Sequence, residues 1–238
     1  MKNARSELGS NNIDLDFSFL GKSVNESSAL PKNFFTDERV FDAEKEKIFR
    51  KDWIAVARVD QLANVGDYLT VDFFGDSIIV AKDKKGTINA FSNICMHRAC
   101  PIAEGSGNQK SVFVCPYHKW SYGLGGELRG APNMEHAVEF EPKGQRLTGL
   151  AVELWQGFIF VNASENPKPP APQLTEFAEK LDPWNFAELK LAGTLTYESP
   201  WNWKILLENF MESYHHMGPH TDTLEPIYPH AGTFSEKT

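Results

Sequence analysis

Two short motifs, Cys95-Met96-His97 and Cys115-Pro116-Tyr117-His118, decide how this 238-residue sequence is interpreted. Each motif supplies one thiol and one imidazole, and 17 residues separate the two. Two cysteines and two histidines are the protein ligands of a Rieske-type [2Fe–2S] cluster, in which one iron binds the cysteines and the other binds the histidines. The motifs therefore predict a centre that carries one electron at a time, with Cys95, His97, Cys115 and His118 as its ligands.

A zinc site is the main alternative, because one zinc ion also accepts two cysteines and two histidines. The neighbouring residues favour the cluster. Pro116 follows the second cysteine, and a stretch rich in aromatic residues and glycine, 120–126, follows His118. Both motifs also come after strand-like runs, at 88–94 and 111–114, as two loops at one end of a sheet would. Chance spacing of the four residues is the remaining alternative.

Composition excludes several classes of protein. A hydrophobic content of 41% and an aromatic content of 12% suit a packed globule. The net charge of −8 argues against nucleic-acid binding, which needs a basic face. No apolar run approaches the roughly 18 residues of a membrane-spanning helix, and the N-terminus lacks the apolar stretch of a signal peptide. With two of its three cysteines assigned to the cluster, the chain is expected in the reducing cytoplasm.

The residue pattern predicts an α+β protein with three regions. Residues 1–50 form an N-terminal segment with one helix at about 36–51, residues 51–165 form the cluster domain, and residues 166–238 begin a second domain. Short apolar runs between turn residues predict strands at 53–59, 68–74, 77–82, 88–94, 111–114 and 150–162, which indicate an antiparallel sandwich or barrel. A proline-rich linker at 166–172 precedes a helix at 173–181, a strand at 189–197 and a helix at 203–216.

A second group of metal-binding residue types lies near the C-terminal end of the sequence. Glu212 and His215 are three residues apart and would share one face of the last predicted helix. Gly218-Pro219 would end that helix and turn the chain back, bringing His220 beside His215. Two histidines and a distant carboxylate form the facial triad that binds ferrous iron in oxygenases. The plain alternative is that these histidines bind no metal and stand at a helix C-terminus, where the helix dipole favours them.

The two groups together resemble the alpha, or large, subunit of Rieske non-haem iron oxygenases of the aromatic-ring-hydroxylating type. The similarity rests on Cys95-Met96-His97-Arg98, on Cys115-Pro116-Tyr117-His118, and on the segment 202–220 with its Asn202-Trp203-Lys204, Glu208-Asn209-Phe210 and Glu212-Ser213-Tyr214-His215 runs. It covers roughly residues 36–235.

The resemblance implies an antiparallel β Rieske domain followed by the start of a helix-grip catalytic domain. It implies that His215 and His220 bind a mononuclear Fe(II), that Glu212 links this site to the Rieske domain of a neighbouring subunit, and that O2 is a co-substrate. Electrons would come from NAD(P)H through a partner reductase, with or without a ferredoxin. The full-length protein would be a homotrimer or an alpha3beta3 assembly that hydroxylates a small organic substrate as a mono- or dioxygenase.

Two departures from the family pattern qualify these expectations. The family's third iron ligand is an aspartate far downstream, and neither Asp222, Glu225 nor Glu236 matches it, so the chain is expected to be an N-terminal fragment that is inactive alone. Most relatives that hydroxylate aromatic rings have aspartate where Glu212 stands. Glutamate there is typical of the branch acting on quaternary ammonium compounds such as carnitine or glycine betaine, so both substrate classes stay open.

An electron carrier without oxygenase activity, a Rieske ferredoxin with an unrelated appendage, is the rival function. Such a carrier would end near residue 165, whereas this chain continues through the linker and the Trp201–His220 segment. Cys100 is expected to be a small core residue without a disulfide partner, and His216 a bystander. His230 carries no signal in the sequence.

Overall fold

The computed structural model describes residues 15–18, 21–170 and 173–232. The described chain forms two compact units. One comprises residues 44–195, and the other combines the described residues before 44 with those from 196 onward. The first 14 residues, the last two residues of the predicted linker, and Glu236 lie outside the described residues.

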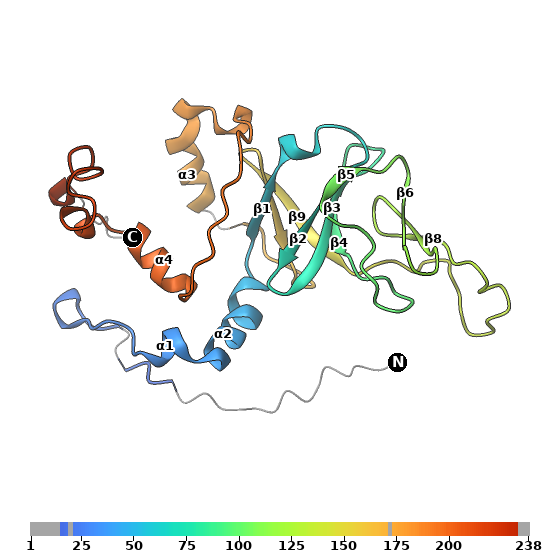
Figure 1. The fold of residues 1–238 in the computed structure, drawn as a ribbon, viewed down its shortest axis with the longest axis horizontal. Coiled ribbons are helices and arrows are strands. Elements are labelled where there is room, and N and C mark those ends of the chain that lie inside the picture. Colours follow the sequence, from blue (N-terminus) through green and yellow to red (C-terminus); the bar gives the residue numbers. More distant parts are fainter. Residues whose placement is uncertain (1–14, 19–20, 171–172, 233–238) are drawn as a thin grey trace. The chain divides into compact units, whose positions relative to one another are not determined.

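The 44–195 unit is built on antiparallel strands, which confirms the predicted fold class (Figure 1). A seven-stranded sheet has the order β1-β10-β9-β4-β3-β2-β5, and a three-stranded sheet has the order β6-β7-β8. The strands are β1 (Ile54–Arg58), β2 (Asp67–Phe73), β3 (Asp76–Lys82), β4 (Ile88–Ser92), β5 (Ser106–Asn108), β6 (Val112–Val114), β7 (Ser121–Gly123), β8 (Leu128–Gly130), β9 (Gly149–Trp155) and β10 (Phe158–Asn162).

Strand β3 explains how one sheet serves two hydrophobic cores. Successive side chains of a strand point to opposite faces. Ile78 and Val80 accordingly pack into a core with Leu62, whereas Ile79 belongs to a second core that contains both Cys95 and Cys115. One face of the sheet therefore contributes buried apolar side chains to the core that contains both cysteines.

Two strand predictions need correction. The run at 150–162 is a hairpin, β9 and β10, because Gln156 and Gly157 adopt φ angles of 47° and 78° that reverse the chain. The short strands β5, β7 and β8 were not predicted, since each contains glycine, a residue depleted in strands.

The predicted strand at 189–197 is wrong: this segment pairs with no described strand. At the start of this segment, the backbone is hydrogen-bonded to side chains instead of to a neighbouring strand. The Arg58 guanidinium donates to the carbonyls of Phe186 and Leu189 at 2.9 and 2.7 Å, and the Asp60 carboxylate accepts the Leu191 N–H at 2.9 Å. These bonds hold the segment against the β1 end of the cluster-bearing unit.

The helices are α1 (Asn33–Thr36), α2 (Glu38–Glu44), α3 (Gln173–Leu181) and α4 (Trp203–Phe210). Helix α3 matches its prediction. The N-terminal helix is broken into α1, α2 and a π-helical turn at Lys45–Phe49, and α4 ends six residues before the predicted His216. None of the helices in the described part of the chain has the length and apolar character needed to cross a membrane.

Candidate functional site

The two cysteine loops, Cys95–Cys100 and Cys115–Trp120, share one hydrogen-bond frame. In each, the cysteine N–H donates to the carbonyl five residues later, at 2.9 and 2.8 Å, and the cysteine carbonyl accepts the N–H four residues later, at 2.9 and 3.1 Å. Ala99 and Lys119 occupy the same place in their loops and have positive φ angles of 53° and 61°. Left-handed backbone costs a non-glycine residue about 1–2 kcal/mol, so contacts elsewhere in the loops must stabilise this conformation.

Asn93 holds the first loop on the sheet. Its buried side chain accepts the N–H groups of Ile102 and Ala103 at 3.0 and 2.9 Å, and donates to the Ala103 carbonyl and the Ser77 hydroxyl at 2.8 and 2.9 Å. All four hydrogen bonds that an amide side chain can make are formed. Both ends of the loop are thereby joined to strand β3 and its neighbour.

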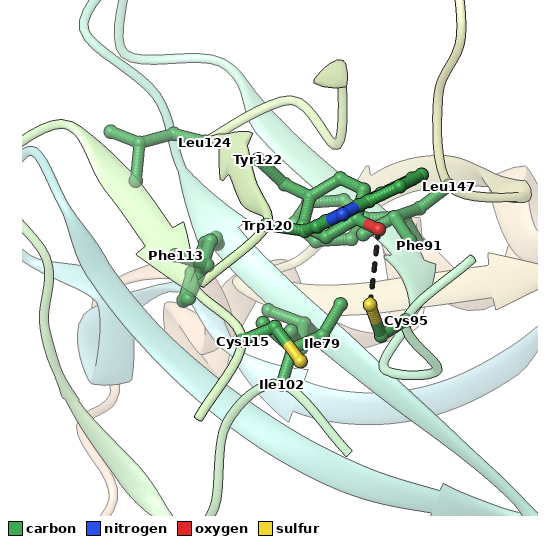
Figure 2. Packing of buried hydrophobic residues seen from close by; sticks show 11 residues of the cluster. Ile79, Phe91, Cys95, Ile102, Phe113, Cys115, Trp120, Tyr122, Leu124 and Leu147 are labelled. Atoms are coloured by element: carbon green, nitrogen blue, oxygen red, sulfur yellow. Dashed lines mark hydrogen bonds between the residues drawn. The ribbon is translucent and has the colours of Figure 1, made fainter. Parts of the chain in front are cut away.

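The two cysteine sulfurs lie inside the protein. Cys95 and Cys115 are each 2% exposed, and neither forms a disulfide. Figure 2 shows both thiols within the buried cluster and the Tyr122 hydroxyl directed at Cys95. The Tyr122 Oη lies 3.3 Å from Cys95 Sγ and accepts the Met96 N–H at 3.1 Å. With Cys95 as a thiol either atom can be the donor, whereas a Cys95 thiolate, which has no hydrogen, accepts the hydrogen of the Tyr122 hydroxyl.

Local hydrogen bonds favour the thiolate at the second cysteine. Burial by itself raises the pKa of the Cys115 thiol, but hydrogen bonds from the backbone N–H groups of Tyr117 and His118, then from the Cys95 and Cys100 thiols, lower it overall. Thiolate is the form that binds metal. Cys100 is free and packs against the same core, as expected, and burial raises the pKa of its thiol.

The imidazoles of His97 and His118 lie next to each other on the outer side, with ring centroids 4.6 Å apart. The Trp120 indole stacks on His97 at 5.0 Å and 6°. The Nδ1 of His97 is buried and has no hydrogen-bond partner. Burial, followed by repulsion from His118 and Arg98, lowers the pKa of His97, so the ring is neutral and its buried nitrogen is free to bind a metal.

These residues fit a binuclear cluster. The thiols are buried and the imidazoles lie nearer the surface. The buried Nδ1 of His97 has no hydrogen-bond partner. Within the described residues, no three His, Cys, Asp or Glu side chains close around a single point as the ligands of one ion would. In a Rieske [2Fe–2S] cluster, each iron takes only two ligands from the protein.

The structure also brings the second predicted group together, although by a different local structure. The carboxylate of Glu212 accepts the His215 N–H at 3.1 Å and lies 2.6 Å from His215 Nδ1. In a continuing helix that N–H would donate to the carbonyl of Met211. Helix α4 ends at Phe210 instead, and a 3₁₀ turn at Tyr214–Met217 follows, so the expectation that Glu212 and His215 share a helix face was wrong.

Glu212 orients the His215 ring. The hydrogen bond with His215 is the main cause of a pKa for Glu212 below its usual value, and partial burial opposes it. A carboxylate at Nδ1 leaves the Nε2 of His215 as the nitrogen available to a metal. The chain turns back after Gly218, and the ring centroids of His215 and His220 lie 5.5 Å apart.

A cavity of about 840 Å³ surrounds these histidines. His216, expected to be a bystander, lines it together with His215 and His220, and its ring lies 4.8 and 5.8 Å from theirs. The wall opposite the histidine turn includes Ile227 and Tyr228. The cavity therefore holds three imidazoles, not the two that the sequence indicated.

Sequence reasoning missed three contributors: Tyr122, Asn93 and the 224–230 segment. Tyr122 could have been found from its place two residues after Trp120 in the aromatic stretch. Asn93 gave a weaker signal, a polar residue at the end of an apolar strand. The 224–230 segment gave none, because its contacts depend on how the chain turns back.

Comparison with protein families matches both groups of residues. Residues 52–147 match the Rieske [2Fe-2S] domain, and residues 186–238 match the catalytic domain of the ring hydroxylating alpha subunit. The cofactors of this family are a Rieske cluster and a mononuclear iron, with O2 as co-substrate.

Curated relatives include oxygenase subunits that act on quaternary ammonium compounds. The carnitine monooxygenase oxygenase subunit of Acinetobacter pittii is 41% identical over 187 residues, 78% of this chain and 50% of its own. The glycine betaine monooxygenase oxygenase subunit of Pseudomonas aeruginosa is 30% identical over 206 residues, 87% of this chain and 48% of its own. The chain thus spans about half the length of the curated relatives it matches.

Solved structures give the same result. The apo form of the quaternary ammonium Rieske monooxygenase CntA superimposes with a TM-score of 0.77 at 39% identity, over 82% of this chain and 57% of that chain. A naphthalene 1,2-dioxygenase superimposes with a TM-score of 0.68 at 30% identity, over 82% of this chain and 46% of that chain. With both domain types matched in order and both metal-binding groups assembled, the chain belongs to the alpha subunits of the Rieske non-haem iron oxygenases.

Proposed function

We propose that this chain is the cluster-bearing part of an oxygenase subunit that hydroxylates a small quaternary ammonium compound. The observation that carries the proposal is the presence in one chain of two cysteine loops with an unpaired His97 Nδ1 and of a His215–His220 pair oriented by a carboxylate. When bound, the [2Fe–2S] cluster supplies single electrons and the mononuclear iron supplies dioxygen activation.

Cys95, Cys115, His97 and His118 are the proposed cluster ligands. The buried thiols and outer imidazoles support this assignment, because they place the histidine side nearest to the surface. Met96 and Tyr117, 42% and 61% exposed, surround the imidazoles with apolar surface on which a reductase or ferredoxin can dock. The proposed source of electrons is NAD(P)H, and three free cysteines support a cytoplasmic location.

His215 and His220 are the proposed iron ligands, and Glu212 the residue that couples the two metal centres. The Glu212 carboxylate holds His215 while 41% of its side chain remains exposed, so it can also accept a hydrogen bond from a neighbouring subunit. The homotrimer or alpha3beta3 assembly expected from the family is part of the proposal. The quaternary ammonium substrate is supported by the carnitine and glycine betaine relatives and by glutamate at position 212.

Product analysis tests the proposed function. The full-length parent of this chain, a reductase and NAD(P)H are incubated aerobically with carnitine, glycine betaine, choline or naphthalene, and products are identified by mass spectrometry. Oxygenated product from a quaternary ammonium compound and none from naphthalene is the expected result. Reduction of the cluster without product from any of the four compounds would favour the electron carrier instead.

A variant series tests the role of Glu212. In the full-length parent, Glu212→Gln should retain both metals, since His215 and His220 remain, but should lower turnover by about 10–100-fold because an amide does not replace the charged acceptor. Glu212→Asp should keep part of the activity. The measurements are iron content and single-turnover oxidation of the reduced cluster. Loss of the mononuclear iron from Glu212→Gln, to the extent seen in His215→Ala, would make Glu212 a ligand and contradict the assignment.

A further inference from the structure

A second glutamate–histidine pair lies beside the histidine cavity and takes no part in the proposed metal binding. His230 Nδ1 lies 2.6 Å from Glu225 Oε1, and the His230 N–H donates to Glu225 Oε2 at 3.0 Å. The two side chains are 36% and 21% exposed. Both carboxylate oxygens are therefore engaged by one residue, which closes the six-residue loop Glu225–His230.

This 225–230 loop forms one wall of the cavity and contacts the third histidine. Ile227, Tyr228 and Pro229 line the cavity. The backbone carbonyl of Tyr228 lies 2.8 Å from His216 Nδ1. A carbonyl only accepts hydrogen bonds, so the hydrogen of neutral His216 must be on Nδ1, and Nε2 must carry the lone pair.

The position of that carbonyl depends on the loop ends. Proline at 226 and at 229 removes two backbone donors from the loop, so few hydrogen bonds are available to hold it. The N–H groups of Ile227 and Tyr228 donate to the Leu224 carbonyl, just before the loop, at 2.9 and 2.7 Å. Among the described contacts, the Glu225–His230 pair joins the last residue of the loop to its first.

We propose that Glu225 and His230 are positioning residues that hold the Tyr228 carbonyl against His216, so that His216 presents Nε2 to the cavity as a hydrogen-bond acceptor. The cavity then offers a fixed acceptor for an O–H or N–H donor beside His215 and His220. This inference goes beyond the proposed oxygenase function and depends only on the geometry of these residues.

The same arrangement occurs at Glu212 and His215, where a carboxylate also accepts both the backbone N–H and the Nδ1 hydrogen of one histidine. The hydrogen bond with His230 is the main cause of a pKa for Glu225 below its usual value. Glu225 is thus ionised at neutral pH, as a strong acceptor must be.

The tautomer of His216 is the direct test. The whole chain is labelled with [15N]histidine, and long-range proton–nitrogen correlation spectra are recorded at about pH 8, above the ordinary histidine pKa of about 6.5. His216 should appear as a single tautomer with hydrogen on Nδ1. Glu225→Gln should convert it to a mixture of the two tautomers, because the neutral amide weakens the hydrogen bond that closes the loop.

Three variants serve as controls. Glu198→Gln, on an exposed glutamate of the same unit, and Tyr228→Phe, which keeps the backbone carbonyl, should both leave the His216 signals unchanged. His230→Asn, whose amide can donate to Glu225 as Nδ1 does, should retain the single tautomer at least in part. A His216 tautomer that is unchanged in both Glu225→Gln and His230→Ala would overturn the proposal, as would a change in Tyr228→Phe.

Discussion

Tyr122 and Trp120 set the surroundings of the cluster ligands at the scale of single residues. Trp120 stands two positions after the second histidine and stacks on His97, so it contributes no hydroxyl to the cluster. Fewer hydrogen bonds to sulfur leave the reduced cluster less stabilised, and a potential near the low end of the Rieske range, roughly −150 mV, is predicted. Tyr122 supplies one such bond, to Cys95 Sγ at 3.3 Å.

Tyr122→Phe should lower the midpoint potential. A hydrogen bond worth about 1 kcal/mol corresponds to roughly 40 mV for a one-electron couple. The change also leaves the part-buried Met96 N–H without its acceptor, which should destabilise the fold by about 1 kcal/mol. Redox titration followed by the Rieske electron paramagnetic resonance signal measures the first effect, and thermal unfolding the second.

Tyr117→Phe is the matched control, because the Tyr117 ring contacts His118 but its exposed hydroxyl makes no hydrogen bond in the described structure. Its potential should equal that of the unmodified chain. Equal potentials for Tyr122→Phe and Tyr117→Phe would show that the Tyr122 hydroxyl does not act on the cluster.

Tight turns determine the register of strands at the scale of elements. Gly66 precedes β2 with a φ of 87°, and its N–H and carbonyl bond to Lys82 and Gln109. A Cβ at this position would overlap the Gln109 carbonyl. Gly86, in the turn between β3 and β4, has a nearly equal φ of 83° but open space around its Cβ position.

Gly66→Ala and Gly86→Ala should therefore separate the steric cost from the conformational cost. Gly86→Ala should lower the free energy of unfolding by about 1–2 kcal/mol, because alanine must adopt left-handed backbone but meets no clash. Gly66→Ala adds a clash with main chain that cannot move without breaking the β2–β5 pairing, and should cost clearly more. Denaturant unfolding of both variants measures the difference. Equal losses of stability would contradict the contact at Gly66.

The two metal-binding groups belong to different compact units at the scale of the whole molecule. The proposed cluster ligands lie in the 44–195 unit, and His215 and His220 lie in the other. Each group draws its supporting contacts from its own unit: Asn93 and Tyr122 for the cluster, Glu212 for the histidine pair. Loss of one metal is therefore expected to leave the other site intact.

In the full-length parent, His215→Ala should lower the iron content from three to two atoms per subunit while the reduced cluster keeps its Rieske spectrum, because a [2Fe–2S] cluster accounts for two. His136→Ala, on an exposed histidine, is the control and should change neither value. Two irons in the unmodified full-length protein would favour the electron carrier. A bleached cluster in His215→Ala would show that the two sites depend on each other.

The antiparallel class could be predicted from the sequence because strands show a period of two, and the candidate ligands of both sites could be proposed because metal chemistry demands particular residue types at short spacings. Helix ends could not. Helix α4 ends at Phe210, and the Glu212 carboxylate accepts the His215 N–H that a continuing helix would have used, a competition that residue patterns do not reveal.

The sequence by itself determined the candidate iron ligands: cysteine and histidine close together in two loops, and a histidine pair five residues apart. Only the tertiary structure decided which nitrogen of each ring is free and which hydroxyl reaches the sulfur. Tyr122 and Cys95 are 27 residues apart, and His216 and Tyr228 are 12 apart. Contacts at such separations depend on how the chain packs, because no local backbone preference brings those atoms together.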